Sequence, residues 1–154
     1  METRTGYMLD TNVFNDVVDG KIDIATLNGR RLIATHIQRD ELNNTTDQKR
    51  RELLLAVFEF MSEDQLGLVP TESALWGVSK WDAAKWGADD GIVGAMRADL
   101  DARNKGKPNN AQDILIAETS LRNGWVLITA DKDLFAAITK YGGACANAFI
   151  LRAV

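Results

Sequence analysis

The stretch "AQDILIAETSLRNGWVLITADKDL" (residues 111–134) indicates the class of fold. Its first half has the pattern of a helix, and Gly124 stands where a helix commonly ends in left-handed backbone. The short apolar run "WVLIT" (125–129) then predicts a buried strand, and a second helical pattern follows it. A helix, a buried strand and another helix in direct succession are typical of a parallel sheet covered by helices.

The rest of the chain repeats this alternation. Short apolar runs predict five strands, at residues 6–9, 31–34, 67–69, 125–129 and 148–151. Helical patterns occur at residues 12–18, 37–43, 48–61, 90–103, 110–123 and 132–141. The third of these carries apolar residues at helical spacing, which predict one buried stripe: Leu53, Leu54, Val57, Phe58 and Met61. We therefore expect an α/β fold with a mostly parallel five-stranded sheet between two layers of helices.

The composition is that of an ordinary globular protein. A length of 154 residues, with 45% hydrophobic and 26% charged residues, predicts a single domain over residues 1–154. The one cysteine, Cys145, cannot form an internal disulfide, which suits a reducing compartment. No apolar run approaches the roughly 18 residues of a membrane span, and the start "METRTG" is unlike a signal peptide. We expect a cytoplasmic protein without a membrane partner.

Acidic residues stand where the predicted strands end. Asp10 follows the first strand, Asp131 follows the fourth, and Glu41 comes soon after the second. Asp113 lies near the start of the helix that leads into the fourth strand, so it belongs to the same edge of the sheet. Ligands of open parallel sheets bind at this carboxyl edge. Four acids that are distant in sequence should therefore converge, and Asp133 could be a fifth.

Each acid also has a simpler explanation. Asp10 and Asp131 could be helix N-caps, Asp113 could complement the dipole of its helix, and Glu41 could belong to a solvated helix face. Convergence favours another interpretation, because crowded carboxylates repel one another and raise one another's pKa unless a cation lies between them. A site made only of oxygen ligands suits Mg²⁺ or Mn²⁺.

The other candidate ligands are few. His36 is the only histidine and lies near the same edge, where it could act as a general base or simply pack at the end of a strand. Zinc is disfavoured, because only His36 and Cys145 could supply imidazole or thiolate ligands.

Three segments resemble the PIN domain family of nucleases, which includes the VapC-type toxins: "MLDTNVF" (8–14), "HIQRDELNN" (36–44) and residues 111–134. The resemblance implies a three-layer α/β/α PIN-like fold with strand order 3-2-1-4-5. It also implies a set of site residues. The catalytic acids are Asp10, Glu41, Asp113 and Asp131; the metal ligands are Asp10, Asp113 and Asp131; the supporting residues are Asn12, Thr129 and Asp133.

The resemblance further implies metal-assisted hydrolysis of RNA phosphodiester bonds with Mg²⁺ or Mn²⁺. For a VapC-like protein, the expected partners are an RNA substrate, a cognate antitoxin and a second copy of the chain. Two alternatives stay open within the same fold: an RNA-processing nuclease that is not a toxin, and a non-catalytic module that binds RNA or protein. A phosphatase or receiver domain is disfavoured, because Asn12 stands where a phosphatase would have a second Asp, and "VPTES" (69–73) offers a receiver no Asp.

The net charge of −4 becomes zero without the four candidate acids, so it does not exclude a nuclease. Phosphate contacts could come from "QKRR" (48–51), from Arg30 and Arg31, or from "RNKGK" (103–107), although "QKRR" could also be a solvated helix face. A further segment contains three tryptophans five residues apart, which could cover the core, bind a protein or stack on RNA: Trp76, Trp81 and Trp86.

Overall fold

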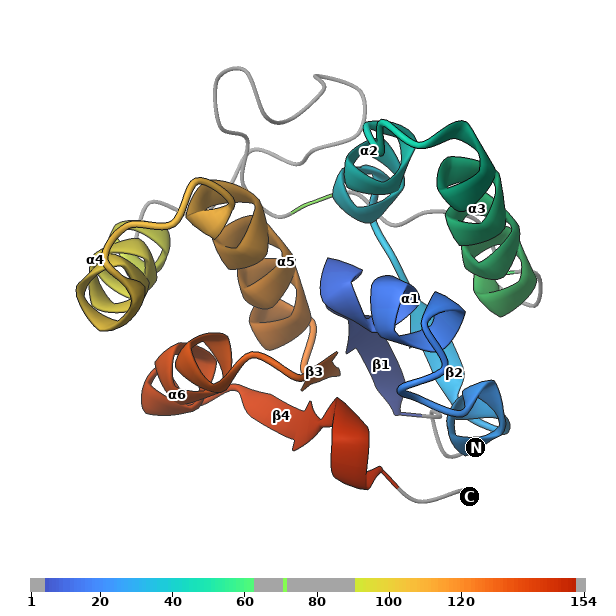
Figure 1. The fold of residues 1–154 in the computed structure, drawn as a ribbon. Coiled ribbons are helices and arrows are strands. Elements are labelled where there is room, and N and C mark those ends of the chain that lie inside the picture. The colour runs from blue at the N-terminus through green and yellow to red at the C-terminus, as the bar shows by residue number, and fades with distance from the viewer. Residues whose placement is uncertain (1–4, 63–70, 72–90, 152–154) are drawn as a thin grey trace.

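The described strands of the protein form one sheet, and all of their pairings are parallel. The structure, a computed structural model, describes residues 5–62, 71 and 91–151 (Figure 1). Within them four strands occur: β1 (Gly6–Leu9), β2 (Arg31–Ile33), β3 (Val126–Thr129) and β4 (Ala144–Asn147). They pair in the order β2-β1-β3-β4, with Met8 of β1 opposite Ile33 on one side and Leu127 on the other. The described part of the sheet therefore has four strands where five were predicted for the chain, and the predicted strand at residues 67–69 lies outside the described residues.

The predicted helices all occur in the described residues, with ends close to those expected. They are α1 (Thr11–Val18), α2 (His36–Asn43), α3 (Gln48–Ser62), α4 (Ile92–Asn104), α5 (Asn110–Arg122) and α6 (Lys132–Lys140). Two short 3₁₀ helices, η1 (Ile24–Leu27) and η2 (Ala148–Ile150), were not predicted. None of the described helices is long and apolar enough to span a membrane. The tryptophan-rich residues 76–86 lie outside the described part of the chain.

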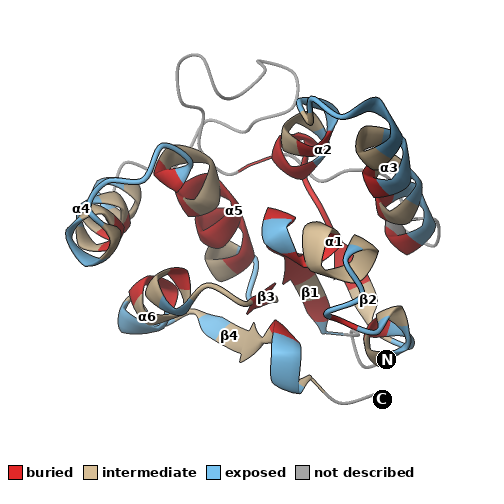
Figure 2. Cartoon of the chain, viewed as in Figure 1, coloured by how far each residue is buried: buried red, intermediate tan, exposed pale blue. Residues whose placement is uncertain are grey.

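Two apolar cores lie on opposite faces of the sheet, because neighbouring residues of a strand point to opposite sides. Met8 and Leu127 join a core with α4, α5 and α6. Leu9 and Ile128 join a second core with α1 and α3. Figure 2 shows the buried residues of β1 and β3 between these two groups of helices. The expected arrangement of helices on both faces of a parallel sheet is confirmed.

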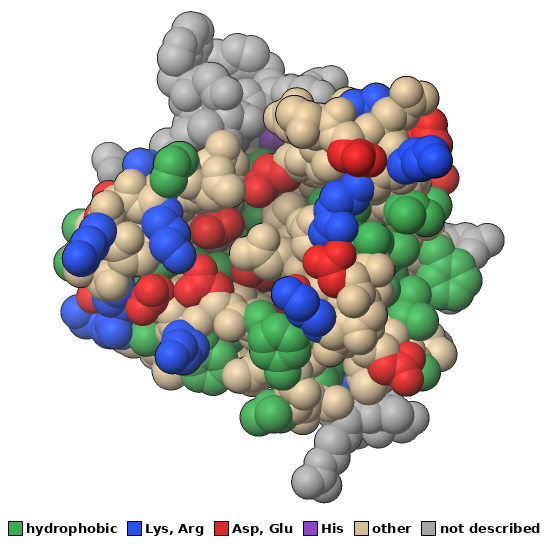
Figure 3. All heavy atoms as spheres, in the orientation of Figure 1, with side chains coloured by type: hydrophobic (Ala, Val, Ile, Leu, Met, Phe, Trp, Pro, Cys, Tyr) green, Lys and Arg blue, Asp and Glu red, His purple; other side chains and the backbone are tan. Residues whose placement is uncertain are grey.

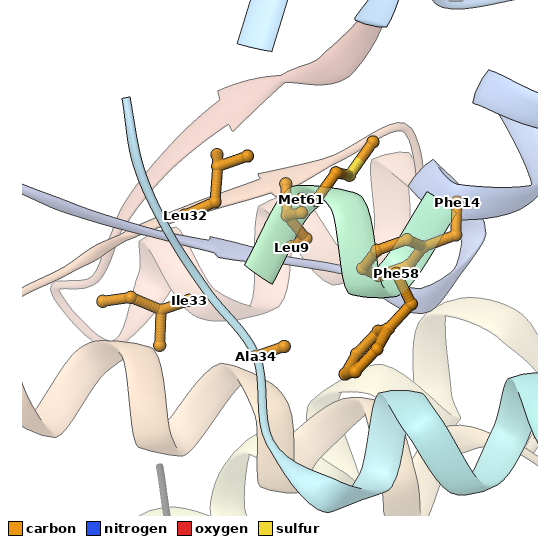
Figure 4. A pocket seen from close by; sticks show the side chains of 7 residues that line it. All are labelled: Leu9, Phe14, Leu32, Ile33, Ala34, Phe58 and Met61. Atoms are coloured by element: carbon orange, nitrogen blue, oxygen red, sulfur yellow. The ribbon is translucent and has the colours of Figure 1, made fainter. Parts of the chain in front are cut away.

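A small gap remains in the second core, between β1, β2, α1 and α3. Figure 4 shows the seven apolar side chains around it: Leu9, Phe14, Leu32, Ile33, Ala34, Phe58 and Met61. Its volume is about 10 Å³, which is at most the space of one water molecule. With apolar walls and so little room, it is a packing defect and not a ligand site.

The last strand differs from the prediction. Residues 148–151 were expected to form it, but the strand is Ala144–Asn147 and the following residues form η2. The Asn147 side chain accepts a 2.9 Å hydrogen bond from the backbone N–H of Phe149, which caps η2 and ends the strand. Residues "ACAN" carry no strong apolar signal, and pairing with β3 makes them a strand.

The buried stripe of α3 is narrower than predicted. Leu54, Phe58 and Met61 are buried and Val57 is partly buried, but Leu53 is 56% exposed. Successive residues of a helix are about 100° apart, so only one of two adjacent leucines can face the sheet directly. The packing of α3 places Leu54, and not Leu53, in the second core.

Candidate metal centre

Asp10 stands at the end of β1, with its side chain buried to 1% exposure. It occupies the N-cap position of α1, yet its side chain makes no capping hydrogen bond. Instead Oδ2 accepts a 2.7 Å hydrogen bond from the hydroxyl of Thr129. In the part of the chain that the structure describes, Oδ1 is buried and has no hydrogen-bond partner. The simpler explanation of Asp10 as a helix cap is therefore wrong.

Asp131 stands at the end of β3 and does cap its helix. Its Oδ1 accepts hydrogen bonds from the backbone N–H groups of Asp133, at 2.9 Å, and Leu134, at 3.3 Å. Its own N–H donates to Thr129 Oγ1 at 3.0 Å, so one hydroxyl connects Asp131 to Asp10. The side chain of Asp131 is thus held in one orientation by α6, and both capping hydrogen bonds use Oδ1.

Glu41 lies on α2 and is held by a residue that the sequence did not indicate. The buried Thr11, the first residue of α1, donates a 3.1 Å hydrogen bond to Oε1 of Glu41. Asn12, for which a supporting role was expected, is exposed, and that role stays a prediction. The signal for Thr11 was weak, because a Thr after an Asp at a helix start is common.

Asp113 lies in the first turn of α5, as predicted. Burial, followed by the charges of Asp10, Glu41 and Asp131, raises its pKa to about 8, while Lys107 acts in the opposite direction. The pKa of Asp10 is raised to about 6 and that of Glu41 to about 7, because burial outweighs the hydrogen bonds from Thr129 and Thr11 that favour the ionised forms. Asp131 also acts on Asp10, and Asp10 on Glu41. The fold thus places the four predicted acids within electrostatic range of one another.

These acids are near neighbours, but they do not form a finished metal site. Among residues 5–62, 71 and 91–151, no three His, Cys, Asp or Glu side chains already surround a point where an ion would fit. Crowded carboxylates repel one another, and a bound cation would remove that repulsion. Figure 3 shows Asp and Glu side chains on the face between α5, α6 and α1.

The donors present fit a hard cation. The unpaired Oδ1 of Asp10 and the carboxylates of Asp113 and Asp131 are oxygen ligands, as Mg²⁺ and Mn²⁺ prefer. Zinc fits poorly, because burial raises the pKa of Cys145 to about 12 and keeps its thiol protonated. His36 is buried at the first position of α2, where access to a substrate is restricted.

The basic groups proposed for phosphate contacts divide into two kinds. Arg50, in "QKRR", donates to Asp19 at 2.7 Å and to Asn15 at 2.9 Å, so it joins α3 to α1. Arg103 donates to Asp99 at 2.8 Å within α4. Lys107 is different, because its charge acts on Asp113. Of these three, Lys107 is the cation best placed for a phosphate at the acidic edge.

Comparison with known proteins identifies the fold. No family model and no curated protein match the sequence. The solved structure of VapBC2 from Rickettsia felis, bound to a DNA fragment from the promoter, matches 92% of this chain and 98% of its own, with TM-score 0.51 and 16% identity. The chain has the fold of a VapC-type PIN domain. The resemblance inferred from the sequence is confirmed at the level of the fold.

Two other solved structures are similar in extent. VapBC-5 from Mycobacterium tuberculosis, a member of the VapBC family of toxin-antitoxin systems, is 20% identical over 93% of this chain and 97% of its own, with TM-score 0.46. FitAcB from Neisseria gonorrhoeae is 20% identical over 94% of this chain and 99% of its own, with TM-score 0.48.

Proposed function

We propose that this chain is a ribonuclease that hydrolyses RNA phosphodiester bonds with Mg²⁺ or Mn²⁺ bound by Asp10, Asp113 and Asp131. The observation that carries the proposal is the carboxylate of Asp10. Thr129 fixes Oδ2 at 2.7 Å, while the buried Oδ1 has no partner in the described chain. A buried, unpaired carboxylate oxygen is unfavourable, and a cation is the partner that removes the penalty.

The surrounding residues orient the acids. A bound Mg²⁺ or Mn²⁺ would polarise the phosphate and lower the pKa of the attacking water. Thr129 restricts Asp10 to one position, and α6 does the same for Asp131. Glu41, held by Thr11, orients the water that attacks phosphorus. Pre-oriented ligands of this kind typically raise metal affinity or activity 10- to 100-fold.

The proposal includes the partners of a toxin. This chain shares the fold of VapBC2, whose structure was solved bound to a DNA fragment from the promoter. We infer that this chain pairs with an antitoxin, one segment of which covers the acidic edge with a cation such as Arg. A second copy of the chain completes the assembly as a homodimer. A processing nuclease with the same fold would have the same chemistry and no antitoxin.

The experiment measures cleavage of single-stranded and hairpin RNA by the purified chain. Cleavage should stop in EDTA, return with Mn²⁺ or Mg²⁺, and fall at least about 100-fold in Asp113→Asn. Glu52→Gln, an exposed acid on α3, is the matched control and should keep full activity.

Analysis of the product ends identifies the nucleophile. Attack by water leaves a 5′-phosphate and a 3′-hydroxyl, whereas attack by the RNA's own 2′-hydroxyl leaves a 2′,3′-cyclic phosphate. Cyclic products that persist in EDTA would overturn the proposal. RNA binding without any metal-dependent cleavage would instead favour the non-catalytic module.

A further inference from the structure

A pocket of about 270 Å³ opens at the carboxyl edge of β3 and β4. Asp131 forms part of its wall, so the pocket is continuous with the candidate metal centre. Pockets for drug-sized ligands measure about 300–1,000 Å³, so this one suits a single flat ring system. We propose that it binds one base of the RNA substrate, beside the phosphate at the acidic edge; the proposal rests on the proposed function.

Two apolar side chains form the wall against which a base can stack. Phe135, on α6, lines the pocket and belongs to neither apolar core of the described chain. Ile150, on η2, lines it as well and is 75% exposed. A base stacked on these side chains removes apolar surface from water, and stacking accepts any base because every base has a flat π face.

Asn147 supplies a polar group with a defined direction. Its Oδ1 accepts the N–H of Phe149 at 2.9 Å, which leaves the NH₂ group as the part of the amide that can contact a ligand. That group has no hydrogen-bond partner among the described residues, although Asn147 lines the pocket. Because the hydrogen bond to Phe149 fixes the amide oxygen, the NH₂ group is the part of Asn147 that is held toward a ligand, and it pairs well with the carbonyl oxygen of uracil, cytosine or guanine.

Lys132 supplies the charge that a nucleotide requires. It lines the pocket, is exposed, and follows Asp131 directly in the chain. Within the described residues it makes no ion pair, so its ammonium group is available to a phosphate. The pocket thus has a cation at its rim, apolar walls inside and one donor group. These features match a nucleotide whose base is inserted into the pocket.

The test measures binding of four fluorescently labelled RNA tetranucleotides, one for each base, by anisotropy in EDTA, where no cleavage occurs. Phe135→Leu keeps an apolar side chain but removes the ring, and Phe135→Ala removes both. Each should weaken binding, roughly 5- to 100-fold for the alanine variant. Phe60→Ala, which removes an exposed ring of α3 outside the pocket, should leave the affinity unchanged.

A second variant tests the base preference. Asn147→Asp keeps the oxygen that caps η2 but replaces the NH₂ donor with a second acceptor, so the preference for bases with a carbonyl oxygen should disappear. Thermal melts of each variant verify the fold. Unchanged affinity in both Phe135 variants, or an unchanged preference in Asn147→Asp, would overturn the proposal.

Two results separate this proposal from the proposed function. If RNA binding depends on Phe135 and Asn147 as expected but the RNA is not cleaved with Mn²⁺, the ribonuclease proposal is refuted and the base-pocket proposal is supported. RNA that is cleaved with Mn²⁺ while the pocket variants retain wild-type KM and base preference would refute the pocket alone. Tetranucleotides that fail to bind the wild-type chain in both EDTA and Mn²⁺ would also refute the pocket, and would favour a peptide as its occupant.

Discussion

Thr129 donates a 2.7 Å hydrogen bond to Oδ2 of Asp10, although 119 residues separate the two in sequence. The hydroxyl has one proton, which it gives to Asp10, so its oxygen is free to accept the N–H of Asp131 at 3.0 Å. A single side chain thereby sets the relative positions of two strand ends and the acids that follow them.

Replacement of this hydroxyl should weaken the metal site. Thr129→Val keeps the shape of the side chain but leaves Oδ2 of Asp10 without its donor and the Asp131 N–H without its acceptor. We expect Mn²⁺ affinity, measured by calorimetry, and RNA cleavage to fall roughly 10- to 100-fold. Thr139→Val is the matched control, because its hydroxyl bonds only within α6, to the carbonyl oxygen of Phe135 at 2.7 Å. Equal Mn²⁺ affinity in both variants would show that Thr129 does not orient a ligand.

Neutralising Asp10 should stabilise the metal-free chain. Asp10→Asn removes a charge whose pKa is raised to about 6 by burial and by Asp131. At pH 8 we expect the free energy of unfolding to rise by roughly 1–3 kcal/mol. The increase in melting temperature that Mn²⁺ produces in the wild type should shrink in this variant, because a ligand is lost.

Asp23→Asn is the control for this substitution, since Asp23 caps η1 through the N–H of Ala25 and Asn caps equally well. It should change neither the stability nor the Mn²⁺-induced shift. An undiminished shift in Asp10→Asn would exclude Asp10 as a metal ligand.

The stability of the metal-free protein should fall as the pH rises from about 4 to about 8. The folded-state pKa values of Asp10, Glu41 and Asp113 are raised to about 6, 7 and 8, above those of the unfolded chain. The folded protein therefore binds more protons than the unfolded one, so folding takes up protons, and a rise in pH lowers the free energy of unfolding. We expect a loss of roughly 2–5 kcal/mol across this range in urea titrations.

Two comparisons test the cause of this pH dependence. Asp113→Asn should flatten the upper part of the curve, because the pKa of Asp113 is the highest of the three. Saturating Mn²⁺ should flatten it as well, since the ion favours the ionised carboxylates. Stability that rises with pH in EDTA would be inconsistent with crowded, buried acids.

Adjacent leucines of α3 should differ sharply when truncated. Leu54 is fully buried in the second core, whereas Leu53 is 56% exposed. Leu54→Ala should lower the free energy of unfolding by roughly 2–5 kcal/mol, and Leu53→Ala by no more than about 0.5 kcal/mol. Denaturation in urea measures both. Similar losses would mean that Leu53 is also buried in solution.

The sequence by itself determined the elements and their class. Apolar periodicity and helix-ending residues are local signals, so all six predicted helices occur and three of the predicted strands lie close to where they were expected. It also indicated that Asp10, Glu41, Asp113 and Asp131 belong to one edge, because the edge on which a strand ends follows from the alternation of strands and helices alone.

Only the tertiary structure decided how each of these residues is used. Asp10 and Asp131 have the same local setting, an Asp between a strand and a helix, yet Asp131 caps its helix and Asp10 does not. Asp10 instead accepts the hydroxyl of Thr129, which reaches it from a neighbouring strand.

The same reason applies to Thr11, which holds Glu41 from another helix, and to β4, which exists through its pairing with β3. Each of these outcomes depends on a partner that is distant in sequence. A local pattern carries no information about such a partner, so it could predict where the acids lie but not which hydrogen bonds hold them.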